Sequence, residues 1–379
     1  MGIVHGAFDP ARTHHVTERI ERKRGLSPIS AKVLVGERIT PDEAVTLLET
    51  ESLGTLGMMA DLVRRRMHTD GVVTYIIDRN VNYTNVCNAF CTFCAFYRQP
   101  GHDEGYVLPV EEIEKKIAET YELGGNQILL QGGHNPKLKI DYYEDLFRRL
   151  KQRFPDLWLH ALSAPEVIHI HKVSRITVQE TLKRLREAGL DSLPGGGAEI
   201  LVDDVRKRLM KNKASGQEWL DVHEKAHRTG MRSTATMMFG HIESRADRIE
   251  HLRMLRDLQD RTGGFTAFIG WTFQPGNTEL GGQEATTAEY LRTMAVARIF
   301  LDNIRNIQAS WVTQGSKVGA ASLAFGVNDM GSTMIEENVV SAAGTVNHMN
   351  EPEIVAAVKD AGFIPMRRNM LYERLGAPN

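Results

Sequence analysis

Apolar positions along the chain recur with two different periods, and the period changes at regular intervals. In "PVEEIEKKIAETYELGG" the residues Ile113, Ile117 and Tyr121 recur at helical spacing, and two glycines end the pattern. Directly after it, "QILLQGG" is a short apolar run of the kind that forms a buried strand. The same succession of strand and helix repeats through most of the chain.

Counted in this way, eight strand–helix units extend from residue 83 to about 345. The predicted strands cover residues 82–86, 127–133, 157–163, 190–197, 232–240, 265–273, 306–311 and 323–330. Strands that are separated by helices of this length pair in parallel, and eight units favour an α/β fold of the closed (β/α)8 TIM-barrel type. An open, doubly wound sheet is the second choice.

The two ends of the chain are predicted to lie outside this repeat. Residues 1–70 form an N-terminal extension, polar and loosely ordered over its first 35 positions, and then two helices that begin near Thr40. A short strand-like run at 72–79 precedes the repeat, so the barrel domain is assigned to residues 71–350. Residues 351–379 are expected to form a C-terminal helix and tail.

Glycine-rich and polar stretches follow the predicted strands one after another. They are "QGGHNP", "SAPE", "PGGGAE", "FGHIE", "FQPGNT" and "NDMGST". In a barrel all of these loops meet at the C-terminal mouth, where barrel enzymes place their chemistry. The pattern therefore predicts an enzyme.

Composition limits where such an enzyme can act and which partners it can have. The chain has 379 residues, a formal net charge of −2 and 42% hydrophobic residues, with no basic cluster that would indicate nucleic-acid binding. No run approaches the roughly 20 apolar residues of a membrane helix, and the N-terminus lacks an apolar signal core. We expect a cytoplasmic protein that neither inserts into membranes nor binds nucleic acid, with its thiols reduced.

All three cysteines lie within eight positions, at Cys87, Cys91 and Cys94. An odd number of thiols in a reducing compartment argues against disulfides. A zinc site would need a fourth ligand, for which His102 is the nearest downstream candidate. An iron–sulfur cube normally takes four thiolates, so three would leave one iron open to another ligand. We favour the cluster over zinc and over a chance grouping.

The spacing C-x3-C-x2-C, with Phe93 before the last cysteine, resembles the cluster loop of the radical S-adenosylmethionine (radical SAM) superfamily. "ILLQGGHNP", "SLPGGGAEI" and "FQPGNTEL" are similar to the branch of futalosine-pathway menaquinone enzymes and deazaflavin FO synthases, above all to its ring-closing members. The likeness covers the chain from about residue 35. Gly270 departs from it, since the family leads us to expect proline there.

The resemblance implies a 4Fe-4S cluster and S-adenosyl-L-methionine as cofactors, and cysteine ligands at the three positions. It implies a small-molecule substrate, dehypoxanthine futalosine, from whose ribose a 5′-deoxyadenosyl radical takes hydrogen before a ring closes. An external one-electron reductant such as flavodoxin or ferredoxin would supply the cluster with an electron. The alternatives are aminofutalosine synthase, in which the radical adds to the substrate, an FO-synthase-like enzyme, and a non-catalytic iron–sulfur protein.

Further cofactor-binding residues follow from the resemblance. Gly132 and Gly133 are expected to meet the methionine end of the cofactor with their backbone, so that a side chain there would block the cofactor and leave the cluster intact. Ser163 and Glu166 either bind S-adenosylmethionine or cap a helix. Glu199 follows three glycines and is expected to be buried beside a cationic partner.

Polar residues at the mouth are candidates for the substrate. Its carboxylate calls for an arginine, for which Arg98 and Arg245 are candidates. The other candidate substrate residues are His134, Gln274, Asn277 and Thr278. The pair His223 and His227 is interpreted as a solvated helix face, and no residue is assigned as the catalytic base.

Overall fold

A computed structural model describes residues 27–49 and 52–376. The apolar runs form the strands β1 Val72–Ile76, β2 Arg79–Asn82, β3 Gln127–Gln131, β4 Trp158–Ala161, β5 Ser192–Leu193, β6 Arg232–Phe239, β7 Phe265–Thr272, β8 Asn306–Gln308, β9 Asp329–Ser332 and β10 Ile364–Arg367. All neighbouring strands pair in parallel. The predicted α/β class is confirmed.

The sheet has the order β10-β1-β9-β8-β7-β6-β5-β4-β3-β2 and curls into a partial barrel. Two residues, Ile77 and Asp78, join β1 to β2, yet β1 pairs with β9 and β2 pairs with β3. The segment 72–82 is therefore one bent strand that links the two flanks of the sheet. Counted so, eight strands surround the interior, and β10 lies outside them against β1.

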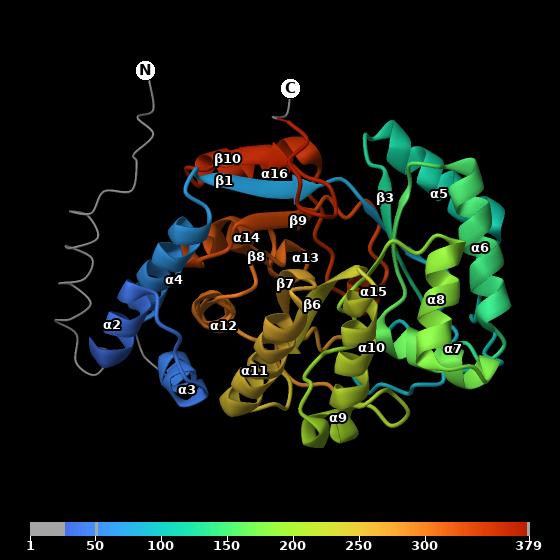
Figure 1. Cartoon of the computed structure of the whole chain (residues 1–379), viewed down its shortest axis with the longest axis horizontal. Coiled ribbons are helices and arrows are strands. Elements are labelled where there is room, and N and C mark those ends of the chain that lie inside the picture. Colours follow the sequence, from blue (N-terminus) through green and yellow to red (C-terminus); the bar gives the residue numbers. More distant parts are fainter. Residues whose placement is uncertain (1–26, 50–51, 377–379) are drawn as a thin grey trace.

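The amphipathic segments form helices around this sheet (Figure 1). They are α2 Ser27–Val35, α3 Pro41–Glu49, α4 Leu53–Met67, α5 Val110–Glu122, α6 Ile140–Arg153, α7 Ala164–Ser174, α8 Val178–Ala188, α9 Asp203–Leu209, α10 Gly216–Arg228, α11 Arg245–Thr262, α12 Thr287–Phe300, α13 Trp311–Gln314, α14 Ser316–Ser322, α15 Val339–Ala342 and α16 Glu351–Asp360. The N-terminal helices join the same body, since α3 packs on α11 and α4 packs on α12. Most of the predicted extension, residues 1–26, lies outside the described residues.

Several segments differ from the predictions; for example, β5 covers only Ser192–Leu193 of the predicted run 190–197, and α2 lies in the part predicted to be loosely ordered. Residues 83–86 leave the sheet, because Thr84 and Val86 form isolated bridges to Val107 and Arg98 instead of pairing with a strand. The last predicted strand begins later, at Asp329, after a 3-10 turn. The C-terminal segment contains the additional strand β10 beside its helix, so it belongs to the sheet and is more than a tail.

Strand register brings the informative loops together. Asn82 at the end of β2 lies opposite Gln131 at the end of β3, and Leu130 lies opposite Ala161 at the end of β4. The loops that begin at these residues are the cysteine loop, "GGHNP" and "SAPE". They are neighbours because parallel strands end at one edge.

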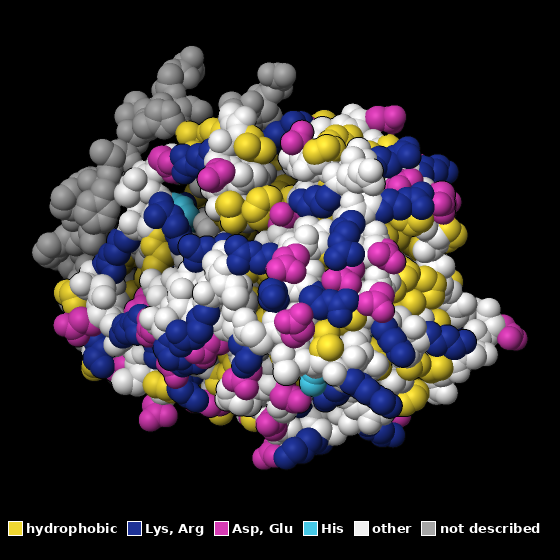
Figure 2. Space-filling view, turned by 45° about the vertical axis from the view of Figure 1, so that its right-hand side comes forward, with side chains coloured by type: hydrophobic (Ala, Val, Ile, Leu, Met, Phe, Trp, Pro, Cys, Tyr) yellow, Lys and Arg dark blue, Asp and Glu magenta, His cyan; other side chains and the backbone are white. Residues whose placement is uncertain are grey.

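The outer surface carries mixed charge. On the face in Figure 2, Lys and Arg side chains are interspersed with Asp and Glu. In residues 27–49 and 52–376, no helix combines the length and the apolar character needed to cross a bilayer.

Candidate active site

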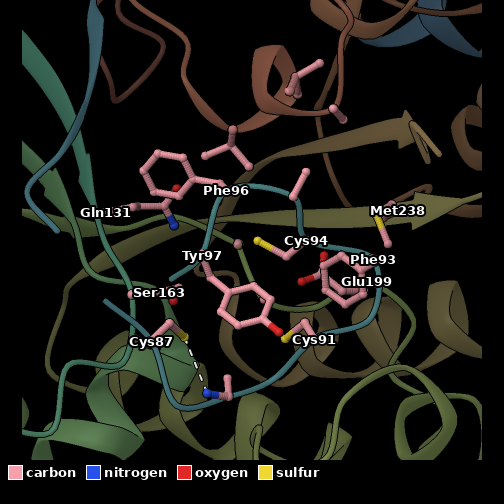
Figure 3. A pocket seen from close by; sticks show the side chains of 18 of the residues that line it. Cys87, Cys91, Phe93, Cys94, Phe96, Tyr97, Gln131, Ser163, Glu199 and Met238 are labelled. Atoms are coloured by element: carbon pink, nitrogen blue, oxygen red, sulfur yellow. Dashed lines mark hydrogen bonds between the residues drawn. The ribbon is translucent and has the colours of Figure 1, made fainter. Parts of the chain in front are cut away.

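A cavity of about 270 Å³ opens where the strands end, and we call it the mouth cavity (Figure 3). It brings together eleven of the residues predicted from the sequence. These are Cys87, Cys91, Phe93, Cys94, Gly132, Gly133, His134, Ser163, Glu166, Glu199 and Gln274. Residues as far apart in the sequence as Cys87 and Gln274 thus line the same cavity.

The cysteine loop between β2 and α5 is held by its own backbone. The Cys87 N–H donates to the Arg98 carbonyl at 2.8 Å, and the Arg98 N–H returns a bond to Asn85. At its outer turn, the Thr92 N–H donates to the carbonyl of Leu209 at the end of α9. In the view of Figure 3, the three sulfurs surround the ring of Tyr97, a lining residue that the sequence reasoning missed.

The three thiols form a donor set that fits an iron–sulfur cluster. Burial raises the pKa of all three, that of Cys91 to about 12, and the buried cation Lys213 opposes this rise. In the part of the chain that the structure describes, no group of three or more His, Cys, Asp or Glu side chains is spaced to hold a single metal ion. In a 4Fe-4S cluster, by contrast, each cysteine ligates a different iron atom, and the nearby cation offsets the negative charge of the thiolates.

The zinc alternative is not supported by the position of His102. This histidine is exposed, and its Nδ1 accepts a hydrogen bond from the Glu104 N–H at 3.1 Å within its own turn. It does not line the mouth cavity with the cysteines.

Arg98 supports the cysteine loop from outside the cavity. Its guanidinium donates to the carbonyls of Ala95 and Tyr97 and pairs with Glu104 at 2.5 Å. Arg245, the other candidate for the substrate carboxylate, pairs with Glu289 at 3.1 Å. Neither arginine lines the cavity.

Gly133 packs directly against the cysteine loop. A Cβ added there would lie 2.3 Å from the Val86 carbonyl oxygen and 2.8 Å from the Cys87 Cβ. A Cβ on Gly132 would lie 2.7 Å from the ring of Tyr83. The close approach that requires glycine is therefore to the protein itself, and at Gly133 it is to a predicted cluster ligand.

Ser163 and Glu166 form the helix cap that was one of the two interpretations. Glu166 accepts from the N–H and the hydroxyl of Ser163, each at 2.7 Å, in a capping box that begins α7. Its other oxygen accepts from the Gly132 N–H at 2.9 Å and from the Tyr83 hydroxyl. Both oxygens are occupied, so Glu166 fixes the glycine loop at the cavity wall.

Glu199 has the buried cationic partner that the sequence predicts. Lys213 lies 2.8 Å from its Oε1, and their side chains are 12% and 5% exposed. Burial by itself raises the pKa of Glu199, but the charge and the hydrogen bond of Lys213 outweigh burial and hold the pKa below its usual value. The ammonium also lies over the Phe93 ring, 5.3 Å from its centroid. Lys213 is a site residue that no sequence motif identified.

A second missed residue is Arg206 of α9, which is buried beneath the "PGGGAE" loop. It donates to the carbonyls of Gly197, Ala198 and Ile200, and to that of Ala214 at 2.6 Å. This one side chain holds the Glu199 loop against the loop that carries Lys213.

The "FQPGNT" segment supports the cavity rim. Gln274 lines the cavity and accepts from the Thr345 hydroxyl at 2.6 Å. Asn277 donates to the Ala342 carbonyl, which tethers α15, and Thr278 bonds within its own turn. Neither Asn277 nor Thr278 lines the cavity.

Three histidines that the sequence analysis singled out are buried. His134 lines the cavity but stacks on His169, with ring centroids 5.1 Å apart, and burial holds its pKa well below the usual range. The interpretation of His223 and His227 as a solvated face is wrong. Both are buried and share hydrogen bonds with the Ser233 hydroxyl.

A second cavity of about 290 Å³ lies inside the barrel, and we call it the lumen cavity. It adjoins the mouth cavity, because Gln131, Trp271 and Thr313 line both. Arg368 and Tyr372 of the C-terminal segment also line it. Because the two cavities share lining residues, a ligand in the lumen lies next to the mouth cavity.

Comparison with known proteins adds to this geometry. The profile of the Radical SAM superfamily matches residues 81–255, and that of the CofH/MqnC C-terminal region matches residues 262–379. The chain is 49% identical to the cyclic dehypoxanthine futalosine synthase of Halalkalibacterium halodurans, over 92% of this chain and 94% of that protein. The chain belongs to the radical SAM superfamily.

Two further likenesses concern another relative and the fold of this radical SAM protein. It is 42% identical to the aminodeoxyfutalosine synthase of Thermus thermophilus, over 92% of this chain and 96% of that protein. Its fold matches that of methylornithine synthase with a TM-score of 0.69 at 20% identity, over 89% and 97% of the two chains. The predicted superfamily, the barrel-like fold and the assignment as an enzyme are confirmed.

Proposed function

We propose that this radical SAM enzyme closes a ring in dehypoxanthine futalosine, in menaquinone biosynthesis, after hydrogen is abstracted from the ribose of the substrate. The observation that carries the proposal is the 49% identity to a cyclic dehypoxanthine futalosine synthase along nearly the whole of both chains. The likeness to the aminodeoxyfutalosine synthase is lower, at 42%. A synthase that adds the adenosyl group to its substrate is therefore the second candidate.

The residues of the mouth cavity have distinct tasks in this proposal. Cys87, Cys91 and Cys94 would hold a 4Fe-4S cluster. When bound, this cluster would supply the electron that cleaves S-adenosyl-L-methionine to methionine and a hydrogen-abstracting 5′-deoxyadenosyl group. Lys213 offers a buried positive charge beside the cysteines, fixed by Glu199. This cation suits the carboxylate of the methionine moiety.

The remaining predicted residues shape the place of the cofactor. Glu166 and Ser163 fix the glycine loop, and Phe93 lies against the Lys213 ammonium. Gln274 and His134 stand on the same walls. A substrate in the lumen would be screened from water by the barrel and would approach the cofactor only at the shared wall. That enclosure protects a reactive carbon radical from side reactions.

Deuterium at the ribose 4′ carbon of the substrate tests the reaction. The reconstituted, anaerobic enzyme is incubated with S-adenosylmethionine, a reductant and the labelled substrate, and the products are weighed by mass spectrometry. We expect deuterium in free 5′-deoxyadenosine and a cyclised product that lacks adenosine. A product that carries the adenosyl group covalently would instead show the adding enzyme.

The electron must come from outside the chain, and we propose a cytoplasmic flavodoxin or ferredoxin as its source. Cys91 approaches the surface loop after α9, with which it forms a bridge at Met210. Replacing a chemical reductant by purified flavodoxin should support turnover. If the enzyme turns over with the chemical reductant but not with reduced flavodoxin, flavodoxin is excluded as the donor.

A further inference from the structure

The walls of the lumen cavity differ in chemistry from one side to the other. Asp78, Asn80, Gln127 and His160 line it from the segment 72–82, β3 and β4. On the β7 and α13 side the lining includes Ile269, Trp271 and Trp311. Trp271 lies inside the barrel yet is only half-buried, so its accessible surface faces the cavities that it lines. The first wall thus carries amide and carboxyl groups, and the facing wall carries two tryptophans together with Gln308, Ser310 and Thr313.

Gln127 has a fixed orientation and an unused acceptor. Its Nε2 donates to the Asp78 Oδ2 at 2.7 Å, which determines that the other amide atom is the oxygen. This Oε1 is buried and has no hydrogen-bond partner among the described residues. Leaving a buried acceptor unpaired costs free energy, so a site that keeps one is suited to a ligand with a donor.

Asn80 carries a second unpaired side-chain oxygen on the neighbouring strand. It lies opposite Leu129 in the β2–β3 register, so its side chain projects from the same face as Leu129 and Gln127. Its Oδ1 is also buried and without a partner in the described chain. Two amide groups from adjacent strands therefore present unused acceptor capacity on one wall of the lumen.

The charges near this wall disfavour an anion. Arg368 lines the lumen, but its Nε and Nη2 are both used by Asp329, at 2.6 and 2.9 Å. Asp78 also lines the lumen, and Ser332 and Gln127 donate to its carboxyl oxygens. A ligand carboxylate placed here would face Asp78 and an arginine already paired with Asp329, whereas hydroxyl groups would find acceptors.

We propose that Asn80 and Gln127 accept hydrogen bonds from the ribose hydroxyls of the substrate and so hold the ribose against the polar wall, with its aromatic ring against Trp271. This proposal rests on the proposed function. Ring closure requires the ribose carbon and the aromatic ring to approach within roughly 3–3.5 Å before reaction. Amide groups on one wall and tryptophans on the facing wall favour that folded shape in a molecule with a sugar at one end and an arene at the other.

Analogues of dehypoxanthine futalosine that lack the 2- or the 3-hydroxyl of the ribose test the assignment. The reconstituted wild-type enzyme and the variants Q127M and N80L are compared by KM and by the ratio of 5′-deoxyadenosine to cyclised product. We expect removal of the contacted hydroxyl to raise the wild-type KM about ten- to hundredfold. In the variant that has lost its partner, the same removal should change KM by less than about threefold, because the interaction is already absent.

The matched control is Y121F. The Tyr121 hydroxyl is also buried without a partner in the described chain, but it lies on α5 and lines neither cavity. With each analogue, the KM of this variant should rise by the same factor as that of the wild type. Substrate-independent formation of 5′-deoxyadenosine and full iron content show that Q127M and N80L are folded.

If removal of a hydroxyl raises the KM of both variants as much as that of the wild type, the assignment of Asn80 and Gln127 is overturned while the reaction itself stands. If the wild type forms no cyclised product from the parent substrate, the proposed function fails, and this proposal fails with it. If either variant cannot be reconstituted, the other decides alone, since each has its own strand and its own hydroxyl.

Discussion

Replacing Gly133 by alanine should damage the cluster site itself. In the structure the added methyl carbon would lie 2.3 Å from the Val86 carbonyl oxygen and 2.8 Å from the Cys87 Cβ. Unstrained carbon contacts lie near 3.5 Å, so the two segments must separate by about 1 Å. The backbone of Gly133 is also tied to the segment before Val86, because its N–H donates to the Thr84 carbonyl at 2.9 Å. The strain therefore falls on the first cysteine.

The magnitude follows from these distances. Overpacking of this kind costs about 1–3 kcal/mol of folding free energy. The displacement matters more, because metal and catalytic sites require their ligands to be held within about 0.5 Å. A movement of about 1 Å at Cys87 exceeds that tolerance. We therefore expect G133A to bind less than half of the wild-type iron.

The assay is iron and sulfide analysis after anaerobic reconstitution, for which the wild type should give about four of each per chain. The control is G54A on α4, where an added Cβ has no neighbour within 4 Å. This variant should keep full iron content and gain up to about 1 kcal/mol of stability. If G133A retains full iron and sulfide but forms no 5′-deoxyadenosine, then Gly133 serves the cofactor and the packing argument is refuted.

Two further predictions concern the buried ion pair and the loop arginine. In K213M burial becomes the dominant influence on Glu199, with the charge of Arg206 still opposing it, so its folded-state pKa rises above that in the wild type. The variant should therefore lose about 3–5 kcal/mol at pH 8 and less at pH 5, as measured by urea unfolding. In the wild type the pKa of Glu199 is lowered, so the pair stabilises the fold above the unfolded pKa and is lost as pH falls through the folded one; equal losses for K213M at both pH values would contradict this. R98M removes the bonds to the Ala95 and Tyr97 carbonyls, so bound iron should fall while the substrate KM stays within threefold. Full iron with a tenfold higher KM would make Arg98 a substrate residue instead.

Local patterns in the sequence determined the elements and the loops that carry chemistry. The strands at residues 232–239 and 265–272 match the predicted runs within one residue, because both runs are rich in the β-branched, aromatic and other apolar residues that favour buried strands. The grouping of Cys87, Cys91 and Cys94 on one loop needs no tertiary information. Their convergence with Gly133 and Glu199 followed from the rule that parallel strands end at one edge.

Tertiary structure alone decided which side chains meet. Periodicity shows that His223 and His227 share a helix face, but whether that face is buried depends on the neighbour that covers it, here Ser233 of β6. Lys213 and Arg206 lie in a polar stretch that reads as a solvated surface, and both are buried once the loops close over them. The unused acceptors of Asn80 and Gln127 likewise depend on the register of β2 against β3. Hydrogen bonds and ion pairs act over a few ångströms between residues far apart in sequence, so no local pattern encodes them.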